Sequence, residues 1–354
     1  MKKLYINEKE VCEKSVAHYT RADIARIIIR SGYFQLGVSN HMNDSLEGKI
    51  LLESFNISMR QNNDLLAFLT SFTFNENSLN QFRLYGKEDN KDGTGVSLVI
   101  QNNFFKSQFD PEDPSDFINM SFKAANINDL QTNQSKVTKE NIIEKKEDTN
   151  KVIRLFEKLP LFRCIYIDPK TNYVSVASKS KVSFYDLMKN EENIEGLWED
   201  YSKKINDLSK SLEDELKGIK GNIEEIKNLI NEIGSENSEA IYEAIGTTLL
   251  PLIYLTKHVA FEEEAECRIF YITSLMNNLI KSSEKERRVY VEYSTKITAL
   301  DSDNKIYLEK IYLGSKADSK MELILKKDWI DSLNLKSGQH ADIPKIEKST
   351  LPLA

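Results

Sequence analysis

The sequence predicts an α+β fold with a central, mostly antiparallel sheet, flanking helices and a long helical insertion. Two observations support this prediction. Short apolar runs of strand length occur in both halves of the chain. Between them lies a long stretch in which apolar residues recur at steps of three and four, the spacing of amphipathic helices. We therefore expect one α+β domain over residues 1–354, with a helical insertion at about residues 183–260.

In the first half of the chain, a helix is expected from residue 22, where the run ADIARIII has apolar residues at helical spacing. Gly32 is a typical signal for the end of that helix, and Thr20 is a candidate cap at its start. A short helix over residues 79–85 is ended by Gly86. Strands are predicted at residues 33–38, 67–74 and 96–100.

In the second half, residues 136–158 are strongly charged and are expected to form a helix. The runs 163–168 and 173–177 are typical of a hairpin that turns at Pro169. Further elements are predicted as strands at residues 288–293 and 305–313 and as a helix at residues 319–333.

The helical insertion contains the most regular apolar pattern of the chain. Its members are Ile205, Leu208, Leu212, Leu216, Ile219, Ile223, Ile226, Ile230 and Ile233. This nearly heptad spacing predicts a long amphipathic helix. Gly218 and Gly221 interrupt the pattern, so a helical hairpin that breaks near Lys220 is an alternative. The apolar stripe either packs inside the chain or forms a homodimer through the helices at residues 200–260, and both interpretations stay open.

Composition excludes several classes of protein. The chain has 55 acidic and 48 basic residues, a net charge of -7, and no basic block, so duplex nucleic acid is not the default partner. Cys12, Cys164 and Cys267 are few and widely spaced, which indicates a reducing compartment rather than a disulfide framework or a zinc knuckle.

The chain carries no pattern typical of export or of a membrane protein. Its first residues, MKKLYINEKEV, have charges where a signal peptide needs an apolar region. The most apolar helical stretch, residues 247–256, is too short to span a bilayer and contains Pro251. We expect a cytoplasmic protein without a membrane partner.

A group of acidic residues precedes a predicted strand in the segment FEEEAECRIFYIT, residues 261–273. Glu264 and Glu266 lie two residues apart at the mouth of that strand, so both side chains are expected on the same side, and Arg268 continues the row. Something must offset the repulsion between the two carboxylates, which makes this segment a candidate site. The alternative is a helix that ends in a solvated acidic run, with the strand beginning at Cys267.

Polar side chains from four places are candidates for a common cleft at one edge of the sheet. These places are residues 18–20 (His-Tyr-Thr), the loop 40–47, the helix 82–85 and residues 264–268. The alternative for the same residues is a buried polar network that closes the sheet edge, in which Arg268 pairs with Glu47 or Glu264.

The order of these motifs resembles a bacterial family that is catalogued as a domain of unknown function. In that family we expect His-Tyr-Thr, Asn-Asp-Pro-x-Glu, Trp-x-x-Tyr and Glu-x-Glu-x-Arg, which here fall at residues 18–20, 43–47, 82–85 and 264–268. Ser45 replaces the proline, and Phe82 replaces the tryptophan but keeps an aromatic ring for packing. The resemblance spans most of the chain outside residues 183–245 and implies little chemistry.

A second resemblance is to the ADP-ribosyltransferase superfamily, which places a histidine or arginine and a hydroxyl residue on an early strand and a glutamate on a late one. It implies that NAD is a substrate and that His18, Glu264 and Glu266 are catalytic. Glu266 would accept a hydrogen bond from the nicotinamide ribose and stabilise the oxocarbenium ion, while Tyr85 or Tyr33 would stack on the nicotinamide. The implied NAD-binding residues are Tyr19, Thr20, Asn43, Glu47, Arg83, Tyr85 and Arg268.

The sequence therefore supports three functional hypotheses. The first is an NAD-consuming transferase or glycohydrolase, a toxin or phage-defence effector, with a nucleotide-type small molecule and a macromolecular acceptor as partners. The second is a metal-dependent nuclease built from Asp44, Glu47, Glu264 and Glu266, although no lysine completes the usual strand motif, and we assign no metal ligand. The third is a non-enzymatic sensor or partner-binding domain whose interface is formed by the helices at residues 200–260.

Overall fold

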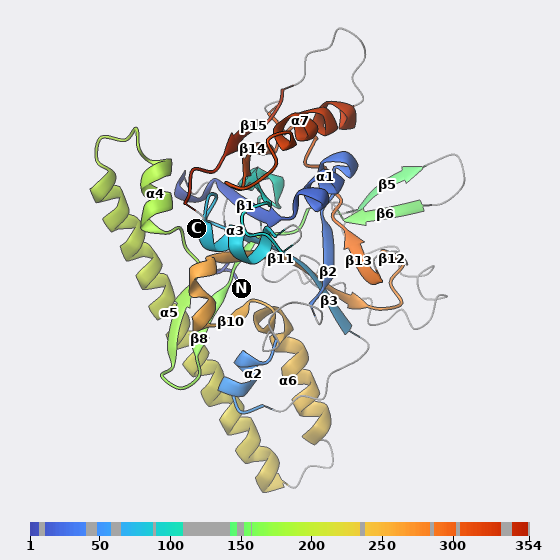
Figure 1. The fold of residues 1–354 in the computed structure, drawn as a ribbon. Helices are drawn as coiled ribbons and strands as arrows, with labels where there is room; N and C mark the ends of the chain where they lie inside the picture. Colours follow the sequence, from blue (N-terminus) through green and yellow to red (C-terminus); the bar gives the residue numbers. More distant parts are fainter. Residues whose placement is uncertain are drawn as a thin grey trace.

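A ten-stranded, mostly antiparallel sheet forms the centre of the described part of the chain, which confirms the predicted α+β class (Figure 1). The computed structural model describes residues 1–6, 11–39, 48–57, 65–87, 90–108, 142–146, 152–156, 158–233, 238–283, 287–301, 305–333 and 342–352. The strand order along the main path is β12-β13-β2-β3-β1-β4-β14-β15, and β11 and β7 branch from it at β3.

Strand β3 (Leu65–Thr73) is the branch point of the sheet because it pairs with three other strands. Along one edge it pairs with β11 (Glu266–Ser274) over the full length of both strands. Its other edge is shared between β2 (Gln35–Val38), which pairs at Leu69, and β1 (Ser15–Thr20), which pairs at Thr73. Segments from the start, the first third and the last third of the chain therefore meet around β3.

The remaining strands extend the sheet on both sides. On one side β1 continues into β4, β14 and β15, and the last two are the only parallel pair among the described strands of this sheet. On the other side β2 continues into β13 and β12, while β7 adds to the free edge of β11. Their bounds are β4, Val96–Gln101; β7, Phe162–Arg163; β12, Ile280–Ser283; β13, Arg288–Glu292; β14, Leu308–Leu313; and β15, Lys345–Lys348.

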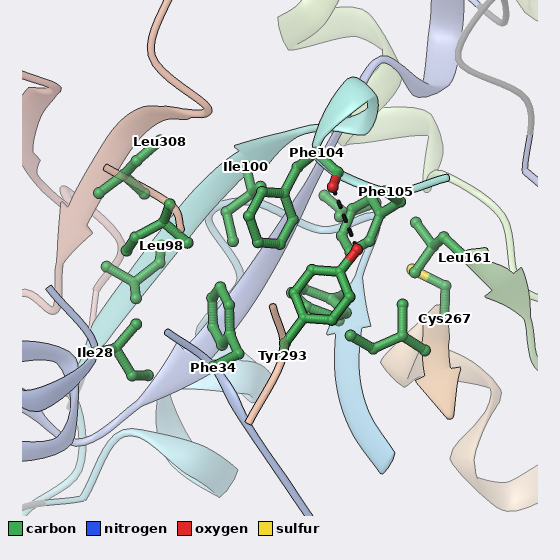
Figure 2. Close-up of a cluster of buried hydrophobic side chains, with 14 of the residues drawn as sticks. Ile28, Phe34, Leu98, Ile100, Phe104, Phe105, Leu161, Cys267, Tyr293 and Leu308 are labelled. Carbon is green, nitrogen blue, oxygen red and sulfur yellow. Dashed lines mark hydrogen bonds between the residues drawn. The ribbon is translucent and has the colours of Figure 1, made fainter. Parts of the chain in front are cut away.

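One face of the sheet is covered by α1 (Ala22–Ser31) and α7 (Met321–Ser332). Between helices and sheet lies an aromatic core in which the rings of Phe34, Phe104, Phe105 and Tyr293 pack edge to face (Figure 2). The buried hydroxyl of Tyr293 donates a hydrogen bond to the carbonyl oxygen of Phe104 at 3.3 Å. This bond avoids the loss of stability that a buried hydroxyl without a partner would cause.

The predicted start and end of α1 had different outcomes. Gly32 ends the helix with φ 79°, the left-handed conformation for which glycine has no steric penalty. The prediction that Thr20 caps the helix is wrong, because Arg21 occupies the cap position and no side chain caps the helix there. Thr20 belongs to β1 instead.

The other face is covered by α2 (Ile50–Ser54), α4 (Lys181–Leu187), the long helix α5 (Ile194–Ile233) and a small sheet of three strands among the described residues. The small sheet has the order β10-β8-β9, and β8 and β9 form the hairpin that the sequence predicted at Pro169. Its strands are β8, Ile165–Asp168; β9, Tyr173–Val176; and β10, Thr256–His258.

Helix α5 spans 40 residues and continues through Gly218 and Gly221, so the predicted long helix is confirmed and no break occurs near Lys220. At 1.5 Å per residue it is about 60 Å long. Its second half extends beyond the sheet, where α6 (Ser238–Ile253) runs back beside it (Figure 1). We call the α5 segment from residue 219 onward together with α6 the helical hairpin.

The predicted helix at residues 136–158 is wrong in the part that the structure describes. Residues 142–146 and 152–156 are the antiparallel strands β5 (Ile142–Lys146) and β6 (Val152–Phe156). Each strand begins with two β-branched residues, which favour strands over helices despite the charges around them.

The strands predicted at residues 33–38, 67–74, 96–100, 288–293 and 305–313 and the helix predicted at 319–333 are confirmed to within a few residues. Across the described residues, no helix combines the length and the apolar character that crossing a bilayer requires.

Candidate functional site

The acidic segment forms a tight turn that delivers two glutamates to one point. A 3₁₀ helix, η6 (Val259–Glu264), ends at Glu264, and β11 begins at Glu266. Between them Ala265 has φ 45°, an uncommon left-handed conformation for a residue with a side chain. The turn is held because the Ala265 N–H donates to the Glu262 carbonyl oxygen and the Thr73 hydroxyl donates to the Glu264 carbonyl oxygen at 2.7 Å.

Two cations hold these carboxylates. Lys257, on β10, donates to Glu264 and, at 2.6 Å, to Oε2 of Glu266. Arg268 donates from Nε to Oε1 of Glu266 at 2.5 Å and from Nη1 to the Tyr254 carbonyl oxygen at 2.6 Å. The prediction that Glu266 and Arg268 lie on one side of the strand is confirmed, because alternate residues of β11 share a face. Glu264, which was expected in the same row, precedes the strand and ends η6.

Tyr85 completes the arrangement from a separate element. It lies at the end of α3 (Leu79–Tyr85) and donates a hydrogen bond from its hydroxyl to Oε1 of Glu264 at 2.6 Å. The same helix is fixed to the acidic turn by Gln81, whose amide donates to the Glu264 carbonyl oxygen at 3.3 Å. We call Tyr85, Lys257, Glu264, Glu266 and Arg268 the buried ion cluster.

The buried ion cluster is electrically balanced and almost sealed from solvent. Two carboxylates face two cations, and the exposed fractions are 8% for Glu264, 6% for Glu266, 4% for Lys257 and 0% for Arg268. Tyr85 is half-buried and is the member that leads toward the surface. Each carboxylate oxygen of Glu264 and Glu266 accepts a hydrogen bond from within the cluster, so the network is satisfied without a bound ion.

The electrostatics of the cluster fix its charges at neutral pH. Burial alone would raise the pKa of Glu266, but Arg268 and Lys257 outweigh it and hold that pKa well below its usual range. Burial alone would lower the pKa of Lys257, but Glu266 and Glu264 outweigh it and raise the pKa instead. Burial, reinforced by the charge of Glu264, raises the pKa of Tyr85. None of these three groups exchanges a proton readily near pH 7, as a general acid or base must.

His18 lies on the opposite face of the sheet from Glu266. The register aligns Ala17 with Thr73 and Thr73 with Glu266, so these three side chains share a face and the next residue along β1, His18, points the other way. There its ring packs against Phe34 and Phe72, with centroids 5.1 and 5.7 Å away. The expectation that His18 and Glu266 face one cleft is therefore wrong.

His18 is a neutral, structural residue in this environment. Its Nδ1 lies 2.9 Å from the Ser71 carbonyl oxygen, which accepts only, so Nδ1 carries the proton. Burial lowers the pKa of His18, and the hydrogen bond to Ser71 offsets only part of that effect.

The other predicted site residues are dispersed. Tyr19 is buried on the face of Glu266, but its hydroxyl donates to the Asn75 carbonyl oxygen at 2.9 Å and its ring packs edge to face on Phe82, as the aromatic replacement at that position predicts. Thr20 alternates with Tyr19 and points to the face of His18. Arg83 precedes Tyr85 by two residues, or about 200° around the helix, and therefore points away from the cluster.

Asn43, Asp44 and Glu47 lie outside the described residues. Among the residues that are described, no group of three or more His, Cys, Asp or Glu side chains could hold a metal ion.

Sequence reasoning missed Lys257, the residue that joins the two carboxylates. Its only signal was position, since it lies seven and nine residues before the two glutamates that it contacts. It also missed a second buried ion pair, in which Arg163 donates to Glu13 while the Tyr201 hydroxyl of α5 donates to the other oxygen of Glu13 at 2.7 Å. This second network attaches α5 to the sheet.

The helical hairpin carries a cavity in the described residues. It is a groove of about 500 Å³ between α5 and α6 that is shallow and open to solvent. Its lining is mostly apolar, and the residues are Ile219, Asn222, Ile223, Ala240, Ile241, Ala244, Ile245, Thr248 and Leu249. A smaller cavity of about 50 Å³ lies between the β8–β9 turn and α5. Neither cavity touches the buried ion cluster.

Comparison of the chain with protein-family models, with curated proteins and with solved structures finds no match. Two places in the described residues are therefore candidate sites, the buried ion cluster and the groove of the helical hairpin.

Proposed function

We propose that this chain is a non-enzymatic binding protein and that it binds another protein through the groove of the helical hairpin. The single observation that carries the proposal is the groove itself. It has a mostly apolar lining and a volume of about 500 Å³, and none of the described residues covers it. Partly exposed isoleucines on both helices form its floor, namely Ile219, Ile241 and Ile245. Leaving such a surface in water lowers stability, which favours a binding role.

The groove suits a protein segment better than a small molecule. Small-molecule sites combine an apolar lining with polar groups that fix the orientation of the ligand. Here only Asn222 and Thr248 contribute side-chain polar atoms to the lining. A shallow channel between two helices instead matches the way in which a third helix inserts an apolar face.

The experiment must avoid residues that hold the chain itself together. Leu212 and Ile223 are each 4% exposed, so a charge at either position would unfold the hairpin and report nothing about a partner. Ala244 is exposed on the groove, and a photoreactive amino acid there samples whatever occupies it. Leu323, 73% exposed on α7, is the matched control position.

We expect irradiation of cells that produce the full chain to give a discrete protein adduct from position 244 and none from position 323. The adduct should disappear when Ala240→Trp or Thr248→Trp, both on the groove, is added, because a large side chain blocks the occupant. Equal adducts from both positions, or an adduct that survives both tryptophans, would refute the proposal.

Consumption of NAD is a second candidate, supported by one observation. Tyr85, Glu264 and Glu266 converge as an NAD-cleaving site requires, and Tyr85 reaches toward the surface. Glu266 would have to exchange Lys257 or Arg268 for the ribose, and His18 would take no part. Incubation of NAD with the wild-type chain and with Tyr85→Phe, which keeps all four charges, tests this candidate. NAD that stays intact with the wild type would eliminate it.

A further inference from the structure

The negative charge of the chain is concentrated in the helical hairpin. Residues 219–253 contain six glutamates and two lysines, a net charge of -4, while the other 319 residues contain 49 acidic and 46 basic side chains. Most of the net charge of -7 therefore belongs to about a tenth of the chain. The six glutamates are Glu224, Glu225, Glu232, Glu236, Glu239 and Glu243.

Neither of the two lysines of this segment lines the groove. Lys220 lines the small cavity beside the β8–β9 turn instead. Lys227 donates to the carbonyl oxygens of Phe55 and Asn56 at 3.1 and 2.8 Å, which turns it toward the body of the protein. Glu224, Glu225 and Glu232 are exposed on α5, and Glu239 and Glu243 are exposed on α6. Exposed carboxylates therefore lie on both helices of the hairpin.

Acidic residues border the groove along both helices. Successive residues of a helix are rotated by about 100°, so on α5 Asn222 lies between the groove residue Ile223 and Glu225 around the helix. On α6, Ala244 lies in the same way between the groove residue Ile245 and Glu243. An apolar channel with acidic margins results.

Gly218 lies about 40° from Asn222 around α5 and is on the same margin, whereas Gly221 lies about 100° from Asn222 and faces away from the groove. Apart from the adjacent backbone of α5, no atom of the described residues lies within 4 Å of a β-carbon built at Gly218 or at Gly221. A glycine inside a helix costs about 1 kcal/mol relative to alanine, so both destabilise α5 without any internal packing reason. Ala240 and Ala244 are equally small on the facing helix. Small residues on both margins allow the backbone of a third helix to approach closely.

We propose that the groove binds an amphipathic helix of a partner protein whose apolar face is bordered on both sides by lysine or arginine. This inference rests on the proposed function, that the groove is a binding surface. The apolar lining takes the leucine-like face, Gly218 and the alanines set a short distance between helices, and the glutamates pair with the basic borders. A second copy of this chain fits poorly, because two hairpins of charge -4 repel each other.

The test uses the full chain and two synthetic peptides of about 21 residues, a length that spans the groove. Both peptides carry leucines at helical spacing; one has lysines on both borders of the leucine face and the other has glutamates. Binding is measured by fluorescence anisotropy at about 0.05 M salt, where electrostatic differences are largest. Ala244→Trp blocks the groove, the pair Glu225→Lys and Glu243→Lys reverses its margins, and Glu309→Lys on β14 is the exposed control.

We expect the lysine peptide to bind at least about tenfold more tightly than the glutamate peptide, a difference equivalent to about 1.4 kcal/mol. Ala244→Trp should weaken it by about tenfold or more, margin reversal should abolish the preference, and Glu309→Lys should change neither. Weakening at higher salt would add support.

Three results overturn the inference in distinguishable ways. If both peptides bind equally and Ala244→Trp weakens both, the groove is a binding surface but basic borders are not recognised. If neither peptide binds, or if Ala244→Trp has no effect on binding, both the inference and the proposed function fail. If the wild type sediments as a dimer and Ala244→Trp as a monomer, the occupant is a second copy of the chain.

Discussion

The buried ion cluster and the helical hairpin are both rich in glutamate, yet they treat charge in opposite ways. In the cluster, each carboxylate contacts a cation within hydrogen-bonding distance, and the site is neutral and sealed. In the hairpin, carboxylates point into solvent beside an open apolar groove. The comparison teaches that neighbouring carboxylates need no ligand when a lysine already pairs with them, and Lys257 does this for both glutamates of the cluster.

The largest effect that separates the two regions comes from removing that lysine. Lys257→Met leaves Glu264 and Glu266 buried with one cation between them, and breaking a buried ion pair costs about 3–5 kcal/mol of the free energy of unfolding. Urea denaturation measures the change. The control is Lys217→Met, which removes an exposed pair with Glu213 and should have a much smaller effect, because solvent screens exposed pairs.

Adding Glu264→Gln to Lys257→Met should recover part of the loss, because the remaining carboxylate, Glu266, still pairs with Arg268. A cost for Lys257→Met below about 1 kcal/mol would mean that the cluster is not the structural unit described here.

A second effect concerns pH and the face of the sheet opposite the cluster. Because burial lowers the pKa of His18 in the folded chain, only the unfolded chain takes up that proton as pH falls below about 6.5. Stability from the neutral imidazole is complete above that pH. Below it, the free energy of unfolding should fall by up to about 1.4 kcal/mol per pH unit.

The measurement compares urea denaturation at pH 7, 6 and 5 for the wild type and His18→Leu. The variant should be less stable at pH 7, since the Ser71 carbonyl loses its donor, but should show a shallower slope. Carboxylates such as Glu266, with a lowered pKa, contribute stability that is lost only below about pH 4.5, outside this window. Parallel slopes would contradict the neutral state of His18.

A third and smaller effect concerns the hairpin side of the comparison. Gly218→Ala and Gly221→Ala should each raise the free energy of unfolding by about 1 kcal/mol, since both positions are helical and open. Gly95→Ala should do the opposite, because its β-carbon would collide with the backbone of Gly86. Thermal denaturation measures whether each substitution raises or lowers stability. A loss of stability in Gly218→Ala and Gly221→Ala would show that α5 itself requires these glycines.

The smallest expected effect is at the groove. Ala244→Trp should change the free energy of unfolding by less than about 0.5 kcal/mol, because the position is exposed and its neighbours leave space. Chemical denaturation measures this value. A large loss would mean that residue 244 packs inside the hairpin and would disqualify the variant as a probe of binding.

The fold was largely predictable because its strongest signals are periodic. The isoleucine and leucine spacing from Ile205 to Ile233 requires one long apolar stripe, and α5 provides it. Gly32 and Pro169 end their elements where backbone geometry demands it. The prediction of a helix at residues 136–158 was wrong because it gave the charge pattern more weight than the β-branched pairs that begin at Ile142 and Val152.

The candidate site was predictable only within a single strand. Glu266 and Arg268 share a face because alternation is fixed along one strand. Whether His18 shares that face depends on the register between β1, β3 and β11, and a shift of one residue reverses the answer. No pattern in the sequence specifies that register, which is set by packing against both faces of the sheet at once.

The position of β3 at the branch of the sheet also constrains how the chain folds. Its partner along one whole edge, β11, is made about 190 residues later, after the long helix and the hairpin. During synthesis, the edge of β3 that pairs with β11 therefore stays unpaired until the ribosome has released residues beyond Ser274. We expect folding to be slow, and partial chains that end within α5 to aggregate or to recruit chaperones.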